Sequence, residues 1–120
     1  MKLYIYILCF FFSILYSQSE FKNVQVLDIT SKSELRNYMK SITKDLGVKC
    51  SHCHNMDDKS LDTPHKEIAR EMILLTRQIN DYLHAFQAND EEGKEEALTV
   101  TCWTCHKGKT EVEQKRPIEE

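Results

Sequence analysis

Apolar residues recur at helical spacing in two stretches of the chain, and each stretch predicts an amphipathic helix. The first stretch begins at Ser31, which forms a capping-box pattern with Glu34 three positions later. Gly47 is well placed to end this helix in the left-handed conformation. The apolar positions between them are Leu35, Tyr38, Met39, Ile42 and Leu46.

The second stretch predicts a longer helix. Thr63 and Pro64 supply an N-cap residue and a proline at the first helical position, and the pattern continues to about Ala88. The polar sequence at 89–93 ends the pattern, and residues 94–98 are expected to form a further helical turn. The apolar positions are spaced by three or four: Ile68, Met72, Leu75, Ile79, Leu83 and Phe86.

The remaining segments are assigned by composition. Residues 24–29 alternate weakly and are interpreted as an extended lead-in, while 55–62 is a polar loop. The opening apolar run is too short to span a bilayer comfortably and predicts a signal peptide at 1–19, with an uncleaved anchor as the alternative. Residues 109–120 are charged and predict a disordered tail. The domain itself is expected to cover 20–108.

One cysteine motif occurs twice, once after each predicted helix. Both copies read C-x-x-C-H, which is the attachment pattern of a c-type haem. Two thiols at this spacing can each bond one vinyl group of a porphyrin, and the adjacent histidine becomes the proximal iron ligand. The sequence therefore predicts two covalently attached haem c groups. Their attachment and ligand residues are Cys50, Cys53 and His54 for the first, and Cys102, Cys105 and His106 for the second.

The fold class follows from this repeat. The chain reads as two helix–turn–CxxCH units, which predicts a small, mainly α multihaem cytochrome c with little or no sheet. Neither half is large enough to hold a core alone, so the two units form one domain. The formal net charge is −3, which predicts no strongly basic face and argues against nucleic acid as a partner.

The sixth iron ligand decides what such a haem does, and methionine favours electron transfer. Met39 and Met72 lie on the apolar faces of the two predicted helices and are the candidate axial ligands. A methionine on such a face is more often a core residue. Two haem irons that each need a sixth ligand nevertheless favour ligation by these two methionines. His84, and less so His65, competes with Met72 for the second iron. His52 is expected to lie outside the reach of the iron.

Two segments resemble the photosynthetic reaction-centre cytochrome c subunit family. The run from Met39 to His54 is similar to its first haem segment. The pattern ARxM…TRxIN at 69–80 and the run VTCWTCHKG at 100–108 are similar to its second. That family has four haems in two dihaem halves and passes electrons to the oxidised special pair. The resemblance implies Met39 as the ligand of the first haem and Met72 as that of the second, in a chain that holds one such half.

These features predict a periplasmic electron carrier that meets redox partner proteins, and not an enzyme. Docking to a membrane respiratory or photosynthetic complex is one way to meet them. The alternative is a haem enzyme or small-ligand sensor in which one iron is five-coordinate. A third interpretation has the thiols hold one tetrahedral zinc or form disulfides, which the histidine after each pair disfavours.

Overall fold

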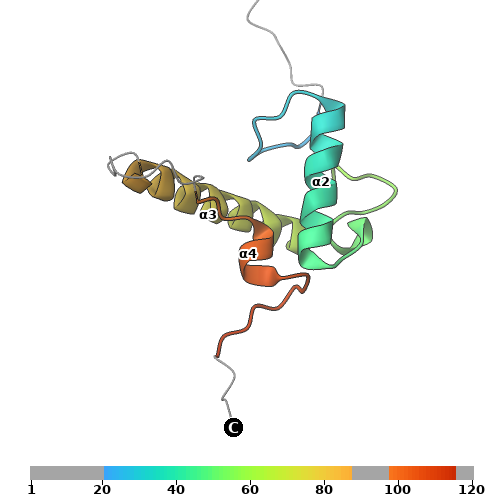
Figure 1. The fold of residues 1–120 in the computed structure, drawn as a ribbon. Coiled ribbons are helices and arrows are strands. Elements are labelled where there is room, and N and C mark those ends of the chain that lie inside the picture. The colour runs from blue at the N-terminus through green and yellow to red at the C-terminus, as the bar shows by residue number, and fades with distance from the viewer. Residues whose placement is uncertain (1–20, 88–97, 116–120) are drawn as a thin grey trace, which may run out of the picture.

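The computed structural model describes residues 21–87 and 98–115, and this part of the chain contains helices and no strand (Figure 1). The predicted mainly α fold class is therefore confirmed. None of the helices in it is long and apolar enough to cross a membrane. The predicted signal peptide, the helix break at 89–93, most of the turn after it and the end of the tail lie outside the described residues.

Helix α2 spans Lys32–Leu46 and begins and ends where its sequence predicts. The Ser31 hydroxyl accepts a hydrogen bond from the backbone N–H of Glu34 (3.5 Å), which satisfies one of the unpaired donors of the first turn. Gly47 follows the helix at φ 64°, a left-handed conformation that glycine adopts without steric cost.

Helix α3 spans Pro64–Gln87 and is fixed at its start by one threonine. The Thr63 hydroxyl accepts from the backbone N–H of Lys66 (3.2 Å), as an N-cap does. The same hydroxyl donates to the carbonyl oxygen of Cys53 (2.6 Å). Thr63 therefore starts α3 and also ties it to the first cysteine motif.

Both cysteine motifs are themselves helical turns, which the sequence pattern did not indicate. The first begins as a 3₁₀ turn at Cys50–His52, and the second forms the short helix α4, Cys102–His106. Side chains three positions apart lie on the same side of such a turn. Each turn therefore carries its two thiols on one side, as attachment to a single porphyrin requires.

Helix α4 packs on the C-terminal end of α2 (Figure 1). The Gly108 N–H donates to the carbonyl oxygen of Asp45 (2.9 Å). A Cβ on Gly47 would lie well inside van der Waals contact of the Gly108 carbonyl oxygen. The two glycines thus allow the end of the first helix and the end of the second motif to touch backbone to backbone.

The lead-in at 21–30 forms no strand, and its backbone is instead held by α3. Arg70 and Arg77, which share one face of α3, donate to the carbonyl oxygens of Asn23 (3.4 Å) and Val26 (2.6 Å). These two guanidinium groups thus supply side-chain hydrogen-bond donors to the backbone of the lead-in and tie it to α3.

The described helices do not build a closed core of their own. Ile73 is the only residue among those described that is buried. The apolar face of α3 stays open to solvent, with Met72 44%, Leu75 48% and Ile79 37% exposed. A contiguous apolar stripe of this kind marks a surface that another group covers.

Candidate haem-binding sites

One cavity brings together the candidate residues of the first motif. Met39 of α2, Cys50, Cys53 and His54 all line it, and its volume is about 680 Å³. Cofactor pockets typically measure about 300–1,000 Å³, so the size suits a haem. Residues that are up to 15 positions apart in the chain are thus placed around one space, which the sequence alone only proposed.

The other walls of this cavity include apolar side chains from the lead-in, α2 and α3. With a haem in the cavity, these side chains would lower the local dielectric around its iron. The apolar lining residues are Phe21, Val24, Val26, Leu27, Leu35, Ile42, Val48, Ala69 and Ile73.

The two motif histidines are held in the same way. His54 Nδ1 lies 3.1 Å from the carbonyl oxygen of Lys59, and His106 Nδ1 lies 3.0 Å from that of Lys109. Because a carbonyl oxygen only accepts, each Nδ1 carries the proton and donates it. Each Nε2 then keeps a free lone pair, which is how histidines that ligate metals are normally oriented.

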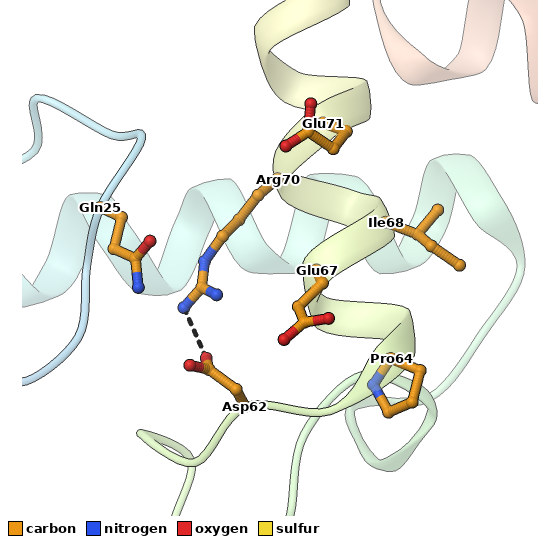
Figure 2. A pocket seen from close by; sticks show the side chains of 7 residues that line it. All are labelled: Gln25, Asp62, Pro64, Glu67, Ile68, Arg70 and Glu71. Carbon is orange, nitrogen blue, oxygen red and sulfur yellow. Dashed lines mark hydrogen bonds and ion pairs between the residues drawn. The ribbon is translucent and has the colours of Figure 1, made fainter.

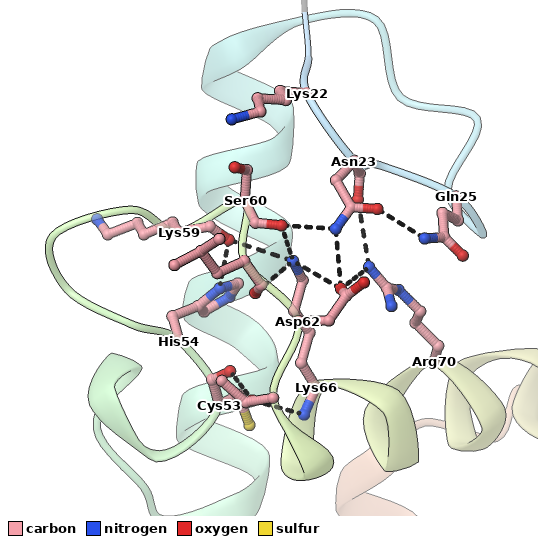
Figure 3. Close-up of polar contacts among 12 residues, drawn as sticks. Lys22, Asn23, Gln25, Cys53, His54, Lys59, Ser60, Asp62, Lys66 and Arg70 are labelled. Atoms are coloured by element: carbon pink, nitrogen blue, oxygen red, sulfur yellow. Dashed lines mark hydrogen bonds and ion pairs between the residues drawn. The ribbon is translucent and has the colours of Figure 1, made fainter.

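A largely buried ammonium group organises the loop that orients His54 (Figure 3). Lys66 Nζ donates to three successive carbonyl oxygens, those of Lys59 to Leu61, at 2.9–3.2 Å. The side chain of Lys66 is only 11% exposed. The Lys59 carbonyl is also the acceptor of His54, so Lys66 positions the group that positions the histidine.

Asp62 joins the loop, the lead-in and α3 (Figure 3). Its Oδ1 accepts from Arg70 (2.7 Å) and from the side-chain amide of Asn23 (2.8 Å). The hydrogen bond from Arg70, then that from Asn23, holds the pKa of Asp62 below its ordinary value. Asn23 has φ 67°, a left-handed conformation that asparagine tolerates better than most residues.

The candidate residues of the second motif do not share the first cavity. Cys102, Cys105 and His106 lie on α4, whereas Met72 lies on the exposed face of α3. The Asn80 side chain exchanges two hydrogen bonds with the backbone of Val100 (2.7 and 2.8 Å), which ties the approach to this motif onto α3. Asn80 lies eight residues after Met72, or about 12 Å along the helix.

A second hollow of about 630 Å³ lies beside the first turns of α3 (Figure 2). The carboxylates of Asp62, Glu67 and Glu71 line it together with Arg70. None of the candidate haem ligands lines it. It adjoins the first cavity through Gln25 and Arg70, which line both.

Comparison with known proteins agrees with the chemistry of these sites. A family model described as the photosynthetic reaction centre cytochrome C subunit matches residues 15–115. The chain belongs to this family. The resemblance drawn from the two motif segments is therefore confirmed. Membership makes the chain a c-type cytochrome, and this family consists of electron-carrier subunits with covalently bound haem c.

Two relatives illustrate the range of the family. The chain is 35% identical over 86 residues to cytochrome c-554 of Chloroflexus aurantiacus. The matched segment covers 70% of this chain and 20% of that protein. It is 30% identical over 90 residues to the photosynthetic reaction center cytochrome c subunit of Rubrivivax gelatinosus. This match covers 73% of the present chain and 22% of the relative. The chain thus spans about a fifth of the length of these relatives. No solved structure matches it significantly.

In this cytochrome, α2 separates the two motifs. Met39 lines the cavity of the first motif. The neighbouring residue Tyr38 lies towards the second motif, and so does Asp45, seven positions after Tyr38. Burial, and then the charge of Asp45, raises the pKa of the Cys102 thiol. Burial, followed by the charge of Cys102, also raises the pKa of Tyr38. One helix therefore presents different faces to the two candidate sites.

The other histidines lie away from the first cavity. The rings of His52 and His65 stack on each other with centroids 4.2 Å apart and planes 19° apart. His65 Nδ1 also lies 3.0 Å from the carbonyl oxygen of His52. Neither ring lines the cavity, and His84 is exposed on α3. The expectation that His52 lies outside the reach of the first iron stays a prediction.

The zinc and disulfide interpretation finds no geometry in the described residues. One tetrahedral zinc needs four converging ligands. In the described part of the chain, no group of three or more His, Cys, Asp or Glu side chains could hold a metal ion. The four motif cysteines there are free.

Sequence reasoning missed several residues that build the sites. Lys66, Asn80 and Gly108 looked like ordinary helix or loop positions, because their roles depend on partners elsewhere in the chain. The available signal was the pair Lys66 and Arg70, which are four positions apart and so share one face of the predicted helix. Gly108, directly after a CxxCH motif and a lysine, was another.

Proposed function

We propose that this chain is an exported dihaem c-type cytochrome that carries electrons between redox partner proteins. The observation that carries the proposal is the matched pair of histidines. His54 and His106 each use Nδ1 on a backbone carbonyl and leave Nε2 free. Family membership supports covalent haem, and the count of two rests on the two complete motifs.

At the first site, we assign thioether attachment to Cys50 and Cys53 and axial ligation to His54 and Met39. Both thiols would hold the haem through thioether bonds, each the product of adding one S–H across one vinyl group. The haem supplies a reversible one-electron couple of iron. The polypeptide holds the ligands and keeps water away with the apolar walls of the cavity.

At the second site, the corresponding residues are Cys102, Cys105, His106 and Met72. The exposed apolar face of α3 is an argument for placing the second haem beside it, because burial of that face would stabilise the fold. The two hydrogen bonds between Asn80 and Val100 would hold the motif next to this face.

The setting of the protein belongs to the same proposal. Residues 1–19 act as a signal peptide, 20–108 form the dihaem domain and 109–120 are a polar tail. Export places the protein in the periplasm, where its partners include an electron donor and an acceptor, and docking to a membrane photosynthetic or respiratory complex fits the family. N-terminal sequencing of the exported protein tests this, and an intact Met1 would contradict it.

The deciding experiment is an intact mass combined with a reduced-minus-oxidised visible spectrum of the exported protein. We expect the mass of two covalent haems and low-spin c-type bands. Cys102→Ser/Cys105→Ser should leave one haem, attached at the first motif. A wild-type protein with one haem or none would contradict the dihaem proposal.

Replacing Met39 tests the axial ligand at the first site. We expect Met39→Ala to lower the reduction potential of one haem and to open one iron to carbon monoxide, because thioether ligation favours Fe(II). Met56→Ala is the matched control, since Met56 is close to His54 in sequence, is 55% exposed and does not line the cavity. Equal effects of both variants would contradict ligation by Met39.

One observation favours the second candidate function, a sensor or haem enzyme with a five-coordinate iron. Met72 is 44% exposed, whereas Met39 is half-buried and lines one cavity together with its motif. If Met72 does not ligate, the reduced wild-type protein should bind carbon monoxide at neutral pH at one haem. A spectrum that does not change under carbon monoxide would remove this candidate.

A further inference from the structure

The cavity of the first site is strongly basic, although the chain as a whole is acidic. Eight Lys and Arg side chains line it, and among the described residues no Asp or Glu does. The expectation of no strongly basic face therefore does not hold around this cavity. The eight residues come from the lead-in, α2, the loops around the first motif and α3: Lys22, Lys32, Arg36, Lys40, Lys49, Lys59, Lys66 and Arg70.

Three of these cations have acidic partners that neutralise them. Lys22 pairs with Asp58 (3.5 Å), and Lys66 and Arg70 pair with Asp62 (3.4 and 2.7 Å). Four others are exposed and form no ion pair within the described residues. We call these four the basic rim: Arg36, Lys40, Lys49 and Lys59.

The basic rim is not needed for the stability of α2. Arg36 and Lys40 are one turn apart on the same side of that helix, and like charges at this spacing are destabilising. A haem carries two propionate groups, which would neutralise at most two of the cations. The rim would therefore keep a positive charge with the cofactor bound.

We propose that the basic rim is the docking surface for an acidic redox partner protein, which exchanges electrons with the cytochrome at its first haem site. The proposal rests on the proposed function, because it needs a haem at the first motif. Complementary charge steers encounters and sets orientation more than it adds affinity. A patch of unpaired cations around the site of electron exchange suits that role.

The experiment uses the full exported chain after its mass has confirmed two haems. The reduced protein is mixed in a stopped-flow instrument with hexacyanoferrate(III) and, separately, with plastocyanin as an acidic one-electron copper protein. In each encounter one electron leaves the cytochrome and reduces one Fe(III) or Cu(II) of the oxidant, and no proton is transferred. The rate constants are measured from about 0.01 to 1 M salt, over which the Debye length falls from about 30 to about 3 Å.

We expect the rate constants with both oxidants to fall about ten-fold or more as salt is raised, with the steeper fall for the protein. Arg36→Gln/Lys40→Gln should lower the low-salt rate constants several-fold and flatten the salt dependence. Glutamine keeps a good helix propensity in α2. Unchanged haem content and visible spectra in the variant would show that the site itself is intact.

The matched control is Lys107→Gln/Lys109→Gln, which makes the same change of charge beside the second motif. Equal slowing in both variants would mean that only net charge matters and would overturn the proposal. Greater slowing in the control would move the docking surface to the second motif, with the same consequence.

Two further outcomes would also overturn the proposal. If salt lowered the rate constant with hexacyanoferrate but not that with plastocyanin, the basic rim would attract small anions and not an acidic protein. Tighter binding to phosphatidylglycerol vesicles than to plastocyanin would assign it to a membrane surface. A chain that lacks haem at the first motif fails the proposed function itself, and the mass reveals this before any kinetic measurement.

Discussion

At the scale of single residues, the first site depends on one carbonyl group that serves two donors. The Lys59 carbonyl oxygen accepts from His54 Nδ1 and from Lys66 Nζ. Sharing an acceptor with a cation weakens the bond to His54, which would make the imidazole less electron-donating towards a metal. The second motif has the same histidine contact, made to Lys109.

Replacing Lys66 tests this arrangement. Lys66→Met keeps the length of the side chain and leaves three carbonyl oxygens, those of Lys59 to Leu61, without their ammonium donor. We expect a loss of about 2 kcal/mol or more in the free energy of unfolding, because hydrogen bonds donated by a charged group each contribute about 1.5–3 kcal/mol. Urea unfolding of the haem-loaded protein measures it. Lys59→Met is the control and should cost no more than about 0.5 kcal/mol.

The bonds of Asp62 to Asn23 and Arg70 predict that the attachment of the lead-in to α3 depends on pH. Its pKa is lowered in the folded protein, by Arg70 first and by Asn23 next. The stabilisation is therefore complete above the unfolded pKa of about 3.9, and it is lost as the pH falls through the folded pKa. The protection of the amides at 21–30 against hydrogen exchange, corrected for the intrinsic dependence of exchange on pH, should therefore fall in acid.

The variant Asp62→Asn separates this carboxylate from other acid effects. It should speed exchange in the lead-in at neutral pH and reduce the further change in acid. Asp57→Asn serves as the comparison, because Asp57 enters the loop network through its backbone N–H (2.8 Å to Asn55). A lead-in that exchanges equally in both variants would argue against Asp62 as the clamp.

At the scale of elements, α2 and α3 each present two different faces. Helix α3 holds the lead-in and the first cavity with Lys66, Arg70 and Arg77, while its apolar stripe stays exposed. Helix α2 lines the first cavity with Met39 and contacts α4 through its last turn. The arrangement of the two candidate sites thus depends on the rotation of these helices about their axes.

The contact between α2 and α4 predicts different effects for two glycines. Gly47→Ala adds a Cβ that clashes with the Gly108 backbone and also strains a residue at φ 64°. Gly108→Ala adds one that lies 3.3 Å from the Trp103 ring at φ 81°. We expect Gly108→Ala to lower the free energy of unfolding by about 1–2 kcal/mol, from left-handed strain. Gly47→Ala should lower it clearly more.

Thermal unfolding of the two haem-loaded variants measures this difference. Because both changes carry left-handed strain, the difference between them reports the backbone contact between α2 and α4. Equal losses would mean that α4 does not depend on close approach at Gly47.

At the scale of the whole molecule, the fold lacks a core made by the polypeptide alone. Only Ile73 is buried among the described residues, and the cavity of about 680 Å³ takes the place of a packed interior. A domain of this length buries a modest fraction of its surface and is marginally stable. Covalent haems would supply the apolar area that closes the space between α2, α3 and the lead-in.

Removing the attachment cysteines tests this dependence. We expect the Ser variants of all four cysteines to lose cooperative thermal unfolding and much of their helical circular dichroism, because the apolar walls then lack a common partner. The two-cysteine variants Cys50→Ser/Cys53→Ser and Cys102→Ser/Cys105→Ser should lie between, with the first the more damaging. A haem-free protein that unfolds cooperatively at high temperature would contradict this view.

Features that depend on neighbours a few positions away could be predicted from the amino-acid sequence. The bounds of α2 follow from the Ser31 cap and from Gly47, and Thr63 and Pro64 begin α3, because caps and helical periodicity are local hydrogen-bond effects. The CxxCH spacing identified the cofactor chemistry for the same reason, since attachment needs two thiols and a histidine within one short segment.

Contacts between groups that are distant in the chain became known from the three-dimensional fold. The sharing of one carbonyl by His54 and Lys66, the contact of Gly47 with Gly108 and the basic rim all join segments that are separated in the chain. No periodicity encodes such pairs, because they depend on how loops close and how helices rotate against each other. Charge is the clearest case: a chain with net charge −3 gathers its cations around one cavity because folding brings four segments together there.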